Sequence, residues 1–153
     1  MIEVVIEDEG WTEVLGAAEE LATRCYAAAL RFEPALDGEI ALLLTDDANM
    51  RALNNRFRGK DKPTNVLSFP GGGDGEFIGD IALARETCVN EAKEKEIALH
   101  DHAAHLIIHG MLHLVGYDHE TDDEAETMER REAEILGSLA IADPNADRAE
   151  TRP

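Results

Sequence analysis

Three histidines in the second half of the chain have the spacing of a metal site. His109 and His113 are four residues apart, so both imidazoles lie on one face of a helix, about one turn from each other. Gly116 follows, where a glycine can adopt a left-handed φ and end the helix, and the chain can then bring His119 back toward the same point. Three imidazoles with a fourth position open are the coordination of a catalytic zinc, because a structural zinc usually has four protein ligands. The spacing therefore predicts a metalloenzyme with one zinc ion per chain, for which nickel or copper can substitute.

Zinc peptidases share this spacing, with one difference at the residue that performs acid–base chemistry. The zincin pattern H-E-x-x-H-x-x-G-x-x-H places a glutamate after the first histidine, and that glutamate is the general base. This chain has Gly110 at that position. The ligands are thus present without the peptidase base, which argues against peptide hydrolysis and requires a helper for a different reaction elsewhere in the chain.

The remaining histidines fall in the same segment and need a separate interpretation. His102, His105, His109 and His113 lie on one face of a helix whose other faces are apolar, which predicts a buried central helix. We expect His100 and His102 to be hydrogen-bonded core residues. His105 is expected beside the metal ligands or in the core, not as a fourth ligand. The core interpretation is disfavoured for the three predicted ligands, because convergent ring nitrogens are costly to bury without a cation.

A basic stretch lies upstream, from Phe57 to Pro70, and its second half has the pattern of a strand. The planar guanidinium of Arg58 suits phosphate oxygens, and near a zinc it would neutralise the charge that builds on a phosphoryl group. Arg56, Lys60 and Lys62 are candidate RNA contacts on the same stretch. The alternative is an ordinary solvated loop, because a short basic run is a weak signal.

Four neighbours of these motifs have less specific expectations. Phe57 and Phe69 flank the basic stretch and are expected in the core, because a strand-end phenylalanine usually faces inward. Stacking of unpaired bases on them is the alternative. Tyr117 and Asp118 are expected to orient His119.

Length and cysteine content indicate one domain in a reducing compartment. The 153 residues suffice for one domain with its own core, which we place at 1–142, followed by a flexible tail at 143–153. Cys25 and Cys88 are far apart, without a C-x-x-C partner, which predicts buried, reduced thiols of a cytoplasmic protein. No apolar run approaches the ~18 residues needed to cross a membrane, so no membrane partner is expected.

The charge is distributed unevenly along the chain. A net charge of −19 would by itself argue against a polyanionic partner. The cationic residues, however, cluster between 51 and 62, whereas acidic residues crowd between 120 and 134. A polyanion would therefore be met at one segment of the molecule.

Apolar periodicity predicts an α+β fold with one mixed sheet of about four strands, about five helices and the metal site on a central helix. Strands are expected at 1–7, 39–45, 64–69 and 77–84, the last two joined as a hairpin through a glycine-rich loop. Helices are expected at 11–32, 46–55, 85–99, 100–115 and 122–140, the last with a capping box from Thr121 to Glu124.

Taken together, three motifs resemble the YbeY family of bacterial endoribonucleases and ribosomal RNA maturation factors. They are the segment from Arg58 to Pro70, the Gly79-Asp80-Ile81 strand and the histidine motif through Tyr117-Asp118-His119. The resemblance extends from about Ala41 to Leu136. It implies a single-domain α+β metalloprotein with zinc on His109, His113 and His119, and a functionally required arginine at Arg58.

The resemblance also implies a biological role. Members of the family cleave single-stranded RNA, act in 16S ribosomal RNA 3′-end maturation and in ribosome quality control, and have small-subunit ribosomal proteins and an assembly GTPase as partners. Two alternatives remain open from the residues alone. One is a non-catalytic ribosome assembly factor with a structural zinc, which would dock by charge complementarity. The other is a zinc hydrolase of a different phosphoester.

Overall fold

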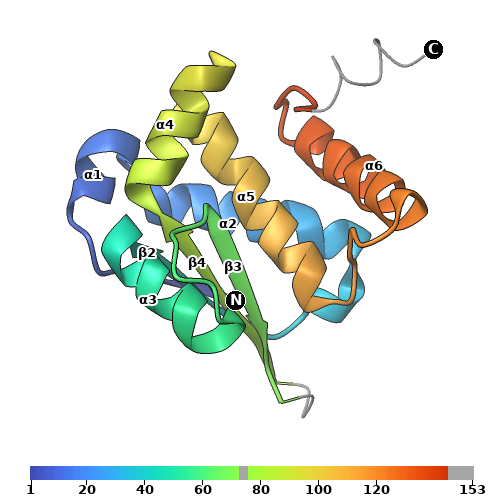
Figure 1. The fold of residues 1–153 in the computed structure, drawn as a ribbon. Helices are drawn as coiled ribbons and strands as arrows, with labels where there is room; N and C mark the ends of the chain where they lie inside the picture. Colours follow the sequence, from blue (N-terminus) through green and yellow to red (C-terminus); the bar gives the residue numbers. More distant parts are fainter. Residues whose placement is uncertain (73–75, 145–153) are drawn as a thin grey trace.

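The computed structural model describes residues 1–72 and 76–144 and has helices on both faces of a single sheet (Figure 1). The strands are β1 (Ile2–Ile6), β2 (Glu39–Thr45), β3 (Val66–Pro70) and β4 (Phe77–Ala84). The helices are α1 (Gly10–Leu15), α2 (Ala18–Phe32), α3 (Asp47–Arg58), α4 (Arg85–Lys95), α5 (Leu99–Leu114) and α6 (Asp122–Ser138), with a 3₁₀ turn at Pro34–Leu36. Most of the tail expected at 143–153 lies outside the described residues, and the single-domain assignment of 1–142 stays a prediction.

The sheet is mixed, as predicted, and its strand order leaves β3 at one edge. The order is β1-β2-β4-β3. β2 pairs in parallel with both β1 and β4, whereas β3 and β4 form the expected antiparallel hairpin. The α+β fold class is therefore confirmed, and the basic segment that precedes β3 reaches the sheet at its edge.

Alternating side chains of the central strands divide the core between the two faces of the sheet. Ile40, Leu42 and Leu44 of β2 face the larger cluster, which also contains residues of α2, α5 and α6. Leu43 and the β3 residue Leu67 face the smaller cluster, which is covered by α3. Most of the burial thus lies on the face that carries α5, and this fixes the position of the predicted histidine helix.

α5 is a central helix and makes its closest approach to the sheet at Gly110. A Cβ at Gly110 would lie 2.9 Å from Cγ2 of Ile81 and 3.1 Å from Oγ of Ser68. The Ser68 hydroxyl donates a hydrogen bond to the Gly110 carbonyl at 3.2 Å. The position at which a peptidase has its glutamate therefore faces the sheet with no space for a side chain, which explains the glycine of this motif.

One expected helix is divided in two. The single helix predicted for 11–32 is wrong, because Gly16 adopts φ 74° between α1 and α2. The bend turns α1 back so that the buried Trp11 donates from Nε1 to the carbonyl of Thr45 at 2.8 Å. The described residues, 1–72 and 76–144, consequently contain six α-helices where about five were expected.

The other predicted core residues are confirmed with two exceptions, His100 and Phe57, which are exposed. Cys25 and Cys88 are buried free thiols, and burial raises the pKa of Cys25 to about 12. His102 is 1% exposed and lies 2.9 Å from Glu91. The expectation for His100 is wrong, because the first turn of α5 leaves it exposed, 3.0 Å from Asp101. Within 1–72 and 76–144, no helix combines the length and apolar content needed to cross a bilayer.

Candidate metal centre

The predicted ligands come together at the C-terminal end of α5 and in the loop that follows it. One ring nitrogen from each of His109, His113 and His119 lies within 4.8 Å of the other two. The Nε2 atoms of His109 and His113 are 3.1 Å apart. Two facing ring nitrogens repel each other unless a proton or a cation lies between them. The donor set therefore fits a metal that prefers imidazole, such as zinc.

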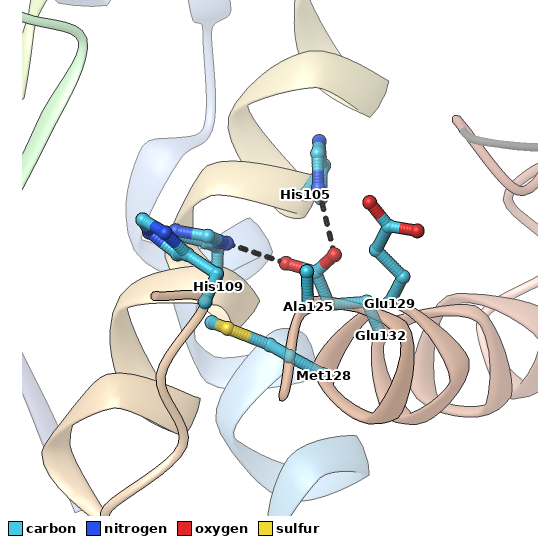
Figure 2. Close-up of a pocket in the computed structure, with 7 residues that line it drawn as sticks. His105, His109, Ala125, Met128, Glu129 and Glu132 are labelled. Atoms are coloured by element: carbon cyan, nitrogen blue, oxygen red, sulfur yellow. Dashed lines mark hydrogen bonds and ion pairs between the residues drawn. The ribbon is translucent and has the colours of Figure 1, made fainter. Parts of the chain in front are cut away.

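The carboxylate of Glu132, in α6, contacts the ring of His109 (Figure 2). Its Oε2 lies 2.6 Å from Nδ1 of His109, and its Oε1 lies 3.3 Å from Nε2 of His105. Because an ionised carboxylate only accepts hydrogen bonds, the His109 hydrogen sits on Nδ1 and the lone pair on Nε2 points toward the other two histidines. This is the tautomer that metal binding requires.

The buried carboxylate of Glu132 stays ionised in this position. It is 2% exposed. Burial alone would raise the pKa of Glu132, but the hydrogen bonds and charges of His105 and His109 outweigh it and lower the pKa to about 2. His105 contacts this carboxylate and lies outside the group formed by His109, His113 and His119, which favours a supporting position over that of a fourth ligand.

A second group of three potential ligand atoms overlaps with the first. His105, His109 and Glu132 also lie within 4.8 Å of one another, around a cavity of about 150 Å³. The shortest pair, at 2.6 Å, has the length of a charge-assisted hydrogen bond. We therefore interpret these residues as the support of the three-histidine centre.

The environment of His113 favours its neutral form. Burial lowers the pKa of His113, and the neighbouring His109 and His119 lower it further, against an opposing hydrogen bond with the backbone of Tyr117. A neutral imidazole keeps the lone pair that a metal ligand needs.

The third ligand is carried by a loop that two side chains fasten to the rest of the molecule. Gly116 adopts φ 103° at the end of α5, as predicted for this glycine. The Tyr117 hydroxyl donates to Glu33 at 2.9 Å, and Arg131 of α6 pairs with the same carboxylate at 2.8 Å. Asp118 accepts from the backbone N–H of His119 at 2.8 Å. Tyr117 and Asp118 thus hold the loop backbone of His119 in place.

A groove of about 660 Å³ lies in front of the histidines and has two chemically different walls. The three histidines and the loop after α5 form one wall. The other wall is formed by Arg58 and the β3 segment, including Asn65 and Ser68. Arg58 reaches it because α3 ends at this residue, where Gly59 adopts a left-handed φ of 69°. A substrate in the groove would therefore be within reach of both the histidines and the guanidinium of Arg58.

The other cations of the basic stretch occupy the outside of this wall. Arg56, Lys60 and Lys62 are exposed and do not line the groove. Asn65, in contrast, is held rigidly, because its amide donates to Glu91 at 3.1 Å and its oxygen accepts from the N–H of Val66 at 2.7 Å. The structure thus brings Arg58 together with the histidines and leaves the other three cations on the surface around them.

The sequence did not indicate which residues outside the two motifs hold the histidines and their loop in place. Glu132 and Arg131 lie in α6, and Glu33 directly follows α2. The residues around them in the sequence gave no indication of a role. The one available signal was an acidic residue on the apolar face of α6, four positions after the buried Met128.

Three comparisons identify related proteins. A protein-family model described as Endoribonuclease YbeY matches residues 6–140. Endoribonuclease YbeY of Chelativorans sp. (strain BNC1) is 56% identical over 126 residues, which cover 78% of this chain and 77% of the relative. Endoribonuclease YbeY of Azorhizobium caulinodans is 47% identical over 156 residues, covering 97% and 98% of the two chains. The solution structure of TM1509 from Thermotoga maritima matches with a TM-score of 0.61 and 27% identity, over 92% of each chain.

Proposed function

The chain belongs to the YbeY family of endoribonucleases, and from this premise we propose a zinc-dependent enzyme specific for single-stranded RNA. As a member of this family it is a hydrolase of RNA phosphodiester bonds with a role in ribosomal RNA processing. The proposed ligands are His109, His113 and His119, and the proposed catalytic residue is Arg58. The observation that carries this assignment is the convergence of three ring nitrogens in a groove that Arg58 also lines.

The chemistry of the donor set supports zinc as the ion. Imidazole nitrogens suit zinc, and three protein ligands leave one position for a reactant. A zinc ion held here would supply a Lewis acid and a nucleophile at neutral pH. Glu132 contributes by keeping the hydrogen of His109 on Nδ1, so that Nε2 faces the centre.

Arg58 supplies the charge stabilisation that the reaction at phosphorus needs. Negative charge builds on the non-bridging oxygens in the transition state, and the guanidinium, which lines the same groove as the histidines, donates to them in this proposal. Arg56, Lys60 and Lys62 bind phosphates farther along the strand in this proposal. Because Gly110 leaves no carboxylate at the peptidase position, peptide hydrolysis is not favoured.

The biological setting that we propose follows from the family. The enzyme would act at the 3′ end of 16S ribosomal RNA and in ribosome quality control, with small-subunit ribosomal proteins and an assembly GTPase as partners. The basic segment and the groove beside it support an RNA substrate on an otherwise acidic protein of net charge −19.

The test is cleavage of an end-labelled single-stranded RNA by the zinc-loaded protein, with His113→Ala purified identically. We expect cleavage by the wild type and none by the variant, because two imidazoles do not retain the ion. His100→Ala is the matched control, since His100 lies on the same helix but is exposed and paired with Asp101. It should cleave as the wild type does.

Other outcomes would replace the proposal. Equal activity of the wild type and His113→Ala would indicate a contaminating nuclease. Inactivity of the wild type on RNA, both free and within small ribosomal subunits, would favour the non-catalytic assembly factor. Hydrolysis of a different phosphoester without cleavage of RNA would favour the general phosphoester hydrolase.

A further inference from the structure

The basic segment carries an exposed aromatic side chain that the metal centre does not use. Phe57, expected in the core, is instead 56% exposed at the C-terminal end of α3. Phe69 of β3 is partly buried against the smaller core cluster, as predicted. The two rings are in contact, with centroids 5.1 Å apart and planes tilted by 57°. The guanidinium of Arg56 lies 5.2 Å from the centroid of the Phe57 ring.

The surroundings of Phe57 distinguish it from an ordinary exposed apolar residue. Single exposed apolar side chains are common and need no explanation. Phe57, however, stands between Arg56 and Arg58, and Arg58 lines the groove. Its ring partner Phe69 lies in β3 between the groove residues Ser68 and Pro70, and because side chains alternate along a strand it faces the smaller core cluster on the other side of the sheet. The pair itself does not line the groove, and Phe57 adjoins it through its neighbour Arg58.

The charges of this segment are available to a ligand. Arg51 is engaged by Asp61 through two hydrogen bonds of 2.7 and 2.9 Å. Arg56, Arg58, Lys60 and Lys62 have no carboxylate within 4.0 Å in the part of the chain that the structure describes. An aromatic face among unneutralised cations fits a ligand that combines a planar ring with a phosphate.

We propose that Phe57, supported by Phe69, stacks an unpaired base of the RNA strand whose phosphates pass Arg58 on the way to the histidines. This inference rests on the proposed function and deepens it. Bases within a duplex are stacked on one another and present no free face, so a platform at this position selects single-stranded RNA. Every base has a π-face, so stacking favours a single strand without specifying its sequence.

The experiment measures steady-state cleavage by the zinc-loaded protein and its Phe57→Leu and Phe57→Trp variants. Leucine keeps the apolar contact with Phe69 but removes the aromatic face, whereas tryptophan restores a larger face. Phe77→Leu is the matched control, because Phe77 is also partly exposed but lies in a separate pocket with Met1 and Glu3. We expect Phe57→Leu to raise KM about 5- to 150-fold with kcat unchanged, and Phe57→Trp to retain the wild-type KM.

Two further experiments, one by fluorescence and one with a modified RNA, locate the stacked base. The fluorescence of 2-aminopurine, placed at successive positions of the RNA, should be quenched by the wild type at one position and not by Phe57→Leu. An abasic residue at that position should raise the wild-type KM by a similar factor and leave the KM of Phe57→Leu nearly unchanged.

The outcomes separate this inference from the proposed function. Cleavage by the wild type with an unchanged KM in Phe57→Leu would overturn the stacking platform and leave the ribonuclease intact. An equal rise of KM in Phe77→Leu would also overturn it, because the effect would then be general. A wild type that cleaves no RNA would overturn both.

Discussion

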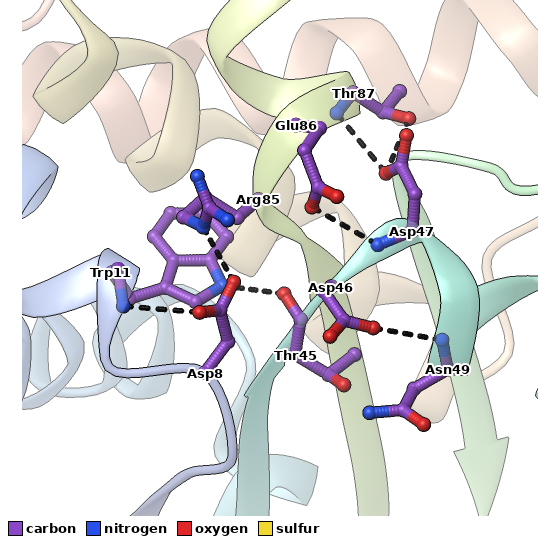
Figure 3. Close-up of polar contacts among 10 residues, drawn as sticks. Asp8, Trp11, Thr45, Asp46, Asp47, Asn49, Arg85, Glu86 and Thr87 are labelled. Carbon is purple, nitrogen blue, oxygen red and sulfur yellow. Dashed lines mark hydrogen bonds and ion pairs between the residues drawn. The ribbon is translucent and has the colours of Figure 1, made fainter.

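Two polar clusters at different places in the molecule differ in whether their acceptor groups already have hydrogen-bond donors. At the C-terminal end of α5, ring nitrogens of three histidines face one another around a groove. At the carboxyl ends of β1, β2 and β4, four carboxylates gather where α1, α3 and α4 begin (Figure 3). Both clusters are dense in groups that titrate or bind ions. Of the two, the first has lone pairs that converge on one point.

In the second cluster, which we call the capping cluster, each carboxylate already accepts a hydrogen bond. The four are Asp8, Asp46, Asp47 and Glu86 (Figure 3). Asp8 accepts from the N–H of Gly10 and from Arg85. The N-termini of α3 and α4 cap each other. The N–H of Asp47 donates to the Glu86 carboxylate, and the N–H of Thr87 donates to the Asp47 carboxylate. These bonds satisfy helix N–H groups that would otherwise lack partners.

A high local density of polar groups therefore does not by itself identify a functional site. A carboxylate whose acceptor capacity is used by backbone N–H groups stabilises the fold, whereas lone pairs that face one another require an ion or a reactant. Substitutions in the capping cluster should therefore change the free energy of unfolding. Substitutions in the metal centre should change metal content and catalysis.

The largest contrast should come from removing one group of each cluster. We expect His109→Ala to lose the metal and to lower kcat/KM at least about 1,000-fold, because metal activation supplies several kcal/mol. Asp47→Asn should retain both metal and activity. Metal analysis and cleavage rates of the two purified variants measure this. Loss of metal from Asp47→Asn, with its fold intact by circular dichroism, would break the distinction between the clusters.

Arg58 should have the next largest effect, in catalysis and without loss of metal. We expect Arg58→Ala to lower kcat about 100- to 1,000-fold, as the removal of one transition-state donor typically does. Arg51→Ala is the matched control, because Arg51 belongs to the same helix but is paired with Asp61. Single-turnover rates at saturating RNA distinguish the two. Normal cleavage by Arg58→Ala would exclude the proposed role.

Substitution of Glu132 should weaken the affinity of the metal centre for zinc without changing which residues bind the ion. We expect Glu132→Gln to weaken zinc binding about 10- to 100-fold, because the carboxylate that fixes the His109 tautomer is lost. Glu126→Gln, on the exposed face of the same helix, should bind zinc as the wild type does. Competition with a chromophoric chelator gives both dissociation constants, and the visible spectrum of the cobalt-substituted protein reports any change of geometry. Equal affinities would show that Glu132 is only a packing residue.

Asp8 should produce the smallest effect, confined to stability and dependent on pH. The hydrogen bond from Arg85 is the main cause that lowers the pKa of Asp8 in the folded protein. A lowered folded-state pKa means that the stabilisation is present above the unfolded-state pKa of about 4 and is lost as the pH falls below it. We expect Asp8→Asn to destabilise the protein by about 1 kcal/mol at pH 7. The difference should shrink below about pH 4.

Urea titrations of the wild type and Asp8→Asn at several pH values check this expectation. A difference that stayed constant down to pH 3 would contradict the assigned cause. A change in RNA cleavage at pH 7 would contradict the separation of the two clusters.

Local spacing explains what could be predicted from the sequence. The i, i+4 histidines and the glycine turn after them bring the proposed ligands together through the geometry of one helix and one loop. The hairpin and the capping box of Thr121, whose hydroxyl accepts from the N–H of Glu124 at 3.1 Å, are local in the same sense. Such features depend on few residues and are little affected by the tertiary fold.

Contacts that depend on the tertiary fold could not be predicted. Glu132 is 23 positions from His109, and Glu33 is 84 positions from Tyr117, so no periodicity connects them. The predictions that Phe57 and His100 are buried were wrong for a related reason. Each lies in the terminal turn of a helix, where exposure is decided by the neighbouring elements and not by the pattern within the helix. The convergence of the three proposed ligands could therefore be predicted from the sequence, whereas the residues that support them could not.

The central claim is that three imidazoles, including the one on the loop, bind a single metal ion. The most direct test is metal analysis combined with zinc-edge X-ray absorption of the wild type and of His119→Ala. We predict one zinc per wild-type chain with three imidazole ligands at about 2.0–2.1 Å and a light-atom fourth ligand, and the loss of the bound zinc in the variant. A sulfur ligand at about 2.3 Å, or an identical spectrum for His119→Ala, would contradict the account.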